Sequence, residues 1–135
     1  MFKYVFSLLV IIGCINAVIS ILSGAIAFHW IGRISSATKN ASYLFGIASI
    51  FQMLMSFAII LSAIFFERIS NESSKKFFLI SGICFFSAIC FFSGSLYWVS
   101  FNGSGFIAPL GALMAIAGFI MMSIGSLNPE ILSKK

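Results

Sequence analysis

The chain alternates long apolar segments with short polar ones. Four segments lack Asp, Glu, Lys and Arg, at about residues 4–28, 43–66, 77–99 and 106–127. A helix of about 20 mostly apolar residues can cross the hydrocarbon layer of a membrane, because it satisfies its backbone polar groups internally. The pattern therefore predicts an all-α protein, in which residues 1–135 form a single integral membrane domain with four transmembrane helices.

The polar connections between these segments are short. They run from Arg33 to Ser42, from Glu67 to Lys76 and over residues 102–105. Short connections make consecutive helices antiparallel neighbours. We therefore expect an up-down-up-down four-helix bundle.

The basic residues lie almost entirely at the ends of the apolar segments. Positively charged flanks favour the cytoplasmic side of a membrane. Six residues fall on one side, Lys3, Arg68, Lys75, Lys76, Lys134 and Lys135, and two on the other, Arg33 and Lys39. This bias predicts a multi-pass protein with cytoplasmic N- and C-termini.

Small and weakly polar residues recur on one face of each predicted helix. Because apolar side chains gain nothing by leaving lipid for one another, membrane helices pack through small residues and hydrogen bonds. The predicted interior stripes are Gly13, Asn16, Ser20, Ser23 and Ala27; Ser49, Gln52, Ser56 and Ala63; Ser81, Cys84, Ala88 and Ser95; and Gly111, Ala115, Gly118, Met122 and Gly125. Asn16 and Gln52 are the most polar side chains at membrane depth, so we expect them to bond to neighbouring helices.

Aromatic residues gather at the predicted outer ends of the first three helices, as an interfacial belt would. They are Trp30, Tyr43, Tyr97 and Trp98. His29, the only histidine, lies beside Trp30 and away from the Asn16 stripe. We therefore interpret His29 as an interfacial residue rather than a proton relay.

Composition narrows the possible functions. The chain is 61% hydrophobic and 8% charged, with a formal net charge of +5. Its positive charges do not cluster as a nucleic-acid surface requires, so we expect no nucleic-acid partner. Cys14, Cys84 and Cys90 lie within apolar segments and form no C-x-x-C motif. We find no arrangement typical of a catalytic, metal or cofactor site, and predict a protein without enzymatic activity or cofactor.

Three motifs resemble those of a known family. Phe92-Ser93-Gly94-Ser95-Leu96-Tyr97, followed by Pro109-Leu110-Gly111-Ala112, is similar to motifs of the Domain of Unknown Function 423 family. Gly24-Ala25-Ile26-Ala27-Phe28-His29 resembles that family's Gly-Ala-Phe-Gly-Ala-His stretch. The resemblance implies a small four-helix protein of the bacterial inner (plasma) membrane with no established activity. Eukaryotic transmembrane protein 256 looks like a distant relative.

The second predicted helix departs from the family pattern. Where the family tends to carry Tyr-Gln-x-x-His, this chain has Ala48-Ser49-Ile50-Phe51-Gln52, so Gln52 replaces the family histidine. This departure argues against ligation of a metal or haem by two imidazoles.

The family-like motifs also have a structural interpretation. Ser93, Gly94 and Ser95 offer small surfaces that allow the fourth helix to approach closely. Pro109 falls in the first turn of that helix, where its missing N–H donor costs nothing, and Gly111 follows where two backbones can cross. We therefore expect these five residues to be packing residues.

We therefore expect a non-enzymatic membrane protein that interacts with membrane lipid, with a membrane protein partner or with further copies of itself. The alternative is a small-solute transporter or channel, acting as a homo-oligomer through a neutral polar pathway that includes Asn16 and Gln52. Proton-coupled export is disfavoured, because such export relies on ionisable groups inside the membrane. Glu67, Glu72 and Glu130 all lie outside the predicted spans.

Overall fold

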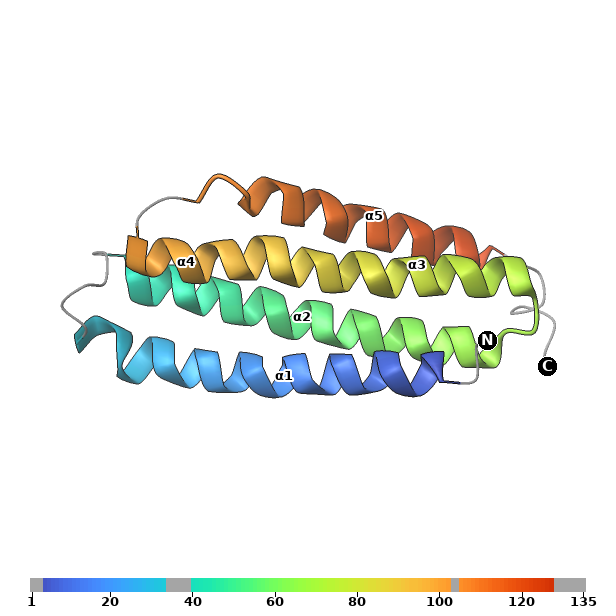
Figure 1. Ribbon diagram of the computed structural model, residues 1–135, viewed down its shortest axis with the longest axis horizontal. Coiled ribbons are helices and arrows are strands. Elements are labelled where there is room, and N and C mark those ends of the chain that lie inside the picture. The colour runs from blue at the N-terminus through green and yellow to red at the C-terminus, as the bar shows by residue number, and fades with distance from the viewer. Residues whose placement is uncertain (1–3, 34–39, 103–104, 128–135) are drawn as a thin grey trace.

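The computed structural model describes residues 4–33, 40–102 and 105–127. These residues form five α-helices and two short helical segments: α1 (Val5–His29), the 3-10 turn η1 (Ile31–Arg33), α2 (Ala41–Arg68), α3 (Glu72–Ala88), the π-helical segment η2 (Ile89–Ser93), α4 (Gly94–Asn102) and α5 (Ala108–Ser126). The segment α3–η2–α4 is one continuous span over Glu72–Phe101 (Figure 1). Four helices long and apolar enough to cross a membrane confirm the predicted fold class.

The four spans lie side by side in a row. α2 packs between α1 and the third span, and α5 packs on the other side of the third span, so α1 and α5 form the two edges (Figure 1). Residue numbers rise along one helix and fall along its neighbour: the Cβ position of Gly13 lies against Ile60, and Ser20 bonds to Ser49. α1 and α2 are therefore antiparallel.

The predicted interior stripes of α1 and α2 face other helices. On α1, Gly13, Ser20, Ser23 and Ala27 are buried, while Asn16 is half-buried. On α2, all four stripe residues are buried. The opposite face of α1 exposes large apolar residues along its length, among them Ile11, Ile15, Val18 and Leu22. Such faces are suited to contact with acyl chains.

Phenylalanines of the third span pack into glycine positions of α5. Three glycines and three phenylalanines, each spaced seven residues apart, form the pairs Gly111 with Phe92, Gly118 with Phe85 and Gly125 with Phe78. A Cβ at Gly111 would lie 2.8 Å from the Phe92 Cα, and one at Gly118 would lie 2.6 Å from the Phe85 ring. The two helices can approach this closely only because these positions carry no side chain.

The π-helical turn of η2 changes which residues face inward. A π-turn places one extra residue in a helical turn, so every later residue is rotated relative to an uninterrupted α-helix. Ser93, the last residue of η2, is buried, and so is Ser100 in α4. Ser95, which simple α-helical spacing places inward, is only half-buried, and Gly94 is exposed.

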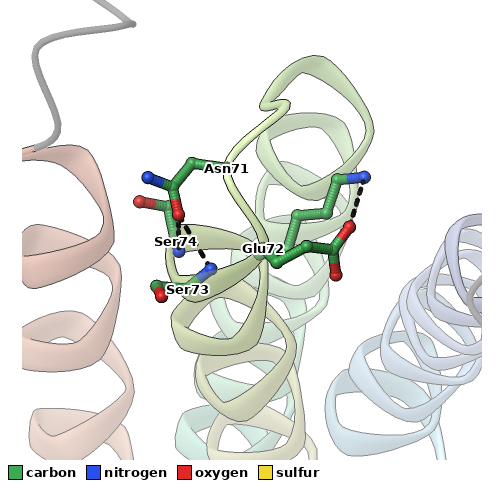
Figure 2. Close-up of polar contacts among 5 residues, drawn as sticks. Asn71, Glu72, Ser73 and Ser74 are labelled. Carbon is green, nitrogen blue, oxygen red and sulfur yellow. Dashed lines mark hydrogen bonds and ion pairs between the residues drawn. The ribbon is translucent and has the colours of Figure 1, made fainter.

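The connection between α2 and α3 is shorter than the sequence suggested. The Asn71 Oδ1 caps α3 by accepting hydrogen bonds from the Ser73 N–H at 2.8 Å and the Ser74 N–H at 3.4 Å (Figure 2). Glu72 forms an ion pair with Lys75 at 3.5 Å. An Asn cap and an acidic first turn both stabilise a helix N-terminus. α3 therefore begins at Glu72, outside the apolar segment.

The described basic residues are divided between the two ends of the helix row. Arg68, Lys75 and Lys76 flank the connection between α2 and α3, whereas Arg33 lies beyond the end of α1 at the opposite end of the row. Lys3, Lys39, Lys134 and Lys135 lie outside the described residues.

Candidate functional site

A polar network joins three helices at membrane depth, with Gln52 of α2 at its centre. The Gln52 side chain is 3% exposed. Its Oε1 accepts a hydrogen bond from the Tyr97 hydroxyl of α4 at 2.7 Å. Its Nε2 donates to the Oδ1 and the backbone carbonyl of Asn16 on α1, at 3.3 and 3.4 Å. Each polar end of the Gln52 side chain therefore has a partner on a different neighbouring helix.

Two serines extend the network by one helical turn. The Ser20 hydroxyl of α1 donates to the Ser49 carbonyl of α2 at 2.8 Å. The Ser49 hydroxyl donates to the Phe45 carbonyl at 2.9 Å and lies 3.4 Å from the Tyr97 hydroxyl. Because Ser20 is buried, its hydrogen bond fixes α1 against α2 beside Gln52.

Bond lengths indicate which links are strongest. A hydroxyl bond of 2.7 or 2.8 Å has the optimal length, whereas amide bonds of 3.3 and 3.4 Å are long. The principal links are therefore Tyr97 to Gln52 and Ser20 to the Ser49 carbonyl. Asn16 adds a weaker one, and its Nδ2 donates to the Ile12 carbonyl of its own helix at 2.9 Å.

Tyr97 is the network member whose role the sequence did not predict. We expected it in an outer aromatic belt, but it is half-buried, and its ring centroid lies 4.4 Å from that of Phe45. Trp30, Tyr43 and Trp98 are exposed, as a belt requires. The available signal was the spacing of Tyr97 from Ser93, since residues four apart share a helix face. Ser93 is buried and donates to the Ala48 carbonyl of α2 at 2.9 Å.

The other predicted site residues lie outside this network. His29 is exposed at the end of α1. Pro109 lies in the first turn of α5 but is exposed rather than packed against another helix, whereas Gly111 packs against the Phe92 backbone. A Cβ at Gly94 would meet no atom within 4 Å, so packing within the chain does not require a glycine there. Gly94 and Ser95 instead line a cavity of about 430 Å³.

The network has the chemistry of neutral amides and hydroxyls. Such groups can hold helices together or bind a neutral polar solute. Within the described residues, no three His, Cys, Asp or Glu side chains form a group that could hold a metal ion, and the three cysteines are unpaired thiols. The arrangement is therefore that of an interhelical contact in which amide and hydroxyl groups bind one another.

Comparison with known proteins identifies a family. No curated protein and no solved structure matches the chain. The family model described as "Protein of unknown function (DUF423)" matches residues 23–112, more than half of the chain. This range contains Gln52 and Tyr97, the three motifs that carry the sequence resemblance and the cavity beside Gly94. The chain therefore belongs to the DUF423 family of proteins of unknown function.

Proposed function

We propose that this chain is a non-enzymatic membrane protein whose helical surface binds lipid, a membrane protein partner or further copies of itself. The observation that carries the proposal is the pairing of polar groups at membrane depth. Gln52, Tyr97 and Ser49 bond to one another or to backbone carbonyls, so their hydrogen-bonding groups are engaged within the protein. Such a network acts as interhelical glue, with each bond contributing about 0.5–2 kcal/mol.

The outer faces of the row supply the surface for this role. α1 and α5 each contact other helices along one side and expose large apolar residues on the other. On α5 these include Leu113, Ile116, Phe119 and Ile120. Exposed apolar faces within membrane spans support contact with acyl chains or with the apolar faces of other membrane helices.

The proposed location is the bacterial inner membrane, with both termini and the connection between α2 and α3 in the cytoplasm. Its support is the six-to-two division of basic residues between the two sides. Three of the six, Arg68, Lys75 and Lys76, flank one short connection, where a charge bias most strongly sets orientation.

Native mass spectrometry of the full chain, extracted gently from its own membrane, tests the proposal. The stoichiometry and all co-purifying molecules are recorded. We expect lipid, a protein partner or a homo-oligomer, and no polar solute. A parallel assay measures solute flux into proteoliposomes, which we expect to equal that of protein-free vesicles.

Retention of a polar solute, or solute flux, would contradict this proposal and favour a transporter. Asn16→Leu and Gln52→Leu would then identify the pathway, since both substitutions remove polar groups from the network. Ser123→Ala is a matched control, because the exposed Ser123 hydroxyl bonds only to the Phe119 carbonyl of its own helix. Flux that disappears in the first two variants and persists in the third would establish a neutral polar pathway.

A further inference from the structure

A cavity of about 430 Å³ lies where α4 meets the start of α5. Gly94, Ser95 and Trp98 of α4 line it on one side, and Phe106 and Ile107 line it on the other. Cys90 in the π-helical segment marks its deeper end. Gly94, Trp98 and Phe106 are exposed, so the cavity opens on the outer surface of the helix row. A lipid of the surrounding bilayer can therefore reach it.

Gly94 forms an open part of this cavity. Its φ of −58° and ψ of −42° are ordinary helical values, so the backbone does not require a glycine. A Cβ there would meet no atom within 4 Å, so helix packing does not require one either. Within the described structure, the effect of having glycine at this position is to leave room in the cavity.

Ser95 brings a hydroxyl to the cavity. Several helical serines of this chain donate to the carbonyl four residues earlier, as Ser87 does to Ile83 at 2.9 Å. Ser95 makes no hydrogen bond to any other described residue. The residue four positions earlier, Phe91, lies in the π-helical segment, where the α-helical ladder is interrupted. The Ser95 hydroxyl lies at the edge of the cavity next to Gly105, where a Cβ would be 3.6 Å from its oxygen, and it has no partner among the described residues.

The depth of the cavity matches a glycerolipid. Trp98 is 63% exposed, and exposed Trp residues favour the membrane–water interface. Ser95 precedes it by about 4.5 Å along the helix axis, and Cys90 lies about 12 Å deeper than Trp98. Ser95 is thus close to the boundary where the ester carbonyls of a glycerolipid lie. Below Ser95 the walls of the cavity are apolar, which suits an acyl chain.

We propose that this cavity binds one glycerolipid, with an ester carbonyl accepting a hydrogen bond from the Ser95 hydroxyl. One acyl chain runs past Gly94 towards Cys90 and is covered by Phe106 and Ile107. The inference rests on the proposed function, since it names a lipid as a ligand of the helical surface. No charged residue lines the cavity, so the ester and the chain determine binding more than the headgroup does.

The test counts lipids retained by the full chain after reconstitution in vesicles of phosphatidylethanolamine and phosphatidylglycerol and gentle extraction. Gly94→Leu fills the cavity. Gly46→Leu is the matched control, because a Cβ at Gly46 in α2 also meets no atom within 4 Å and Gly46 does not line the cavity. Circular dichroism and thermal unfolding of each variant show whether the fold is kept.

We expect the wild-type chain and Gly46→Leu to retain one lipid that Gly94→Leu loses, by at least tenfold in occupancy. Ser95→Ala should lower occupancy about fivefold, the effect of one hydrogen bond. Ser87→Ala should leave it unchanged. If Gly94→Leu retains the lipid, if both leucine variants lose it equally, or if the retained molecule is not a glycerolipid, the inference is wrong.

The result separates this inference from the broader proposal. Equal lipid retention by all variants, in a protein that moves no solute, overturns only the cavity as a lipid site. Solute flux overturns the proposed function, whereas selective lipid loss from Gly94→Leu would still support the cavity as a lipid site. The two experiments measure different quantities, so neither outcome can be mistaken for the other.

Discussion

Gln52 illustrates how a polar side chain is accommodated inside a membrane. An unpaired amide in hydrocarbon costs several kcal/mol, so its partners matter more than its own position. Tyr97 satisfies its carbonyl oxygen at 2.7 Å, and Asn16 satisfies its nitrogen at longer distances. The most consequential single bond in the network is therefore the one between α2 and α4.

Removing the Tyr97 hydroxyl should weaken the fold measurably. Tyr97→Phe keeps the ring next to Phe45 but leaves the Gln52 Oε1 without its shortest hydrogen bond. We expect a loss of about 1–2 kcal/mol in the free energy of unfolding. Reversible unfolding in mixed detergent micelles measures it, with Ser123→Ala as the control. Equal stabilities of the two variants would show that the Tyr97 bond contributes nothing.

Residue-scale prediction succeeded where polarity alone was informative. Asn16 and Gln52 were expected to bond to neighbouring helices, and they bond to each other across α1 and α2. Tyr97 was misplaced because a tyrosine near a helix end is equally suited to the interface and to a buried hydrogen bond. The spacing of Tyr97 from Ser93 was a weak signal, because the burial of Ser93 is itself known only from the structure.

At the scale of elements, glycine spacing predicted one side of a contact but not the other. Gly111, Gly118 and Gly125 recur on one face of α5, and that face is buried. Their phenylalanine partners could not be predicted, because in lipid an apolar ring gains as much from acyl chains as from another helix. The π-helical turn also lacks a local sequence signal, so the inward rotation of Ser100 was missed.

Glycine substitutions should therefore have very different effects at different positions. Gly111→Ala places a Cβ 2.6 Å from the Phe92 Cβ and 2.8 Å from its Cα, where backbone atoms would have to move. We expect a loss of about 1–3 kcal/mol in unfolding free energy.

Gly118→Ala meets the side chain of Phe85 instead, and a ring can shift more readily than a backbone, so its loss should be smaller. Gly94→Ala, with open space around its Cβ, should cost nothing. Thermal unfolding of the three variants in one detergent gives their order. A variant of Gly94 as unstable as that of Gly111 would contradict it.

At the scale of the whole molecule, the helices at the edges of the row have fewer neighbouring helices than those at its centre. α2 and the third span each have a neighbour on both sides, whereas α1 and α5 each pack principally against one span (Figure 1). Periodicity shows which face of a helix packs, but lipid provides no hydrophobic force to decide how many neighbours it has. The sequence therefore predicted four spans and their connections, but not this arrangement.

The membrane orientation of this row can be measured at its two ends. Cys14, Cys84 and Cys90 are first replaced by alanine, and a single cysteine is then introduced as Asn40→Cys or Ser70→Cys. Both positions are exposed, one before α2 and the other after it, so they lie at opposite ends of the row.

The charge bias places Ser70, between Arg68 and Lys75, in the cytoplasm. A membrane-impermeant maleimide should therefore label Asn40→Cys in intact cells and Ser70→Cys only after permeabilisation. Labelling in the reverse order would mean that the basic connection between α2 and α3 faces outward and that the charge bias does not set the orientation of this protein.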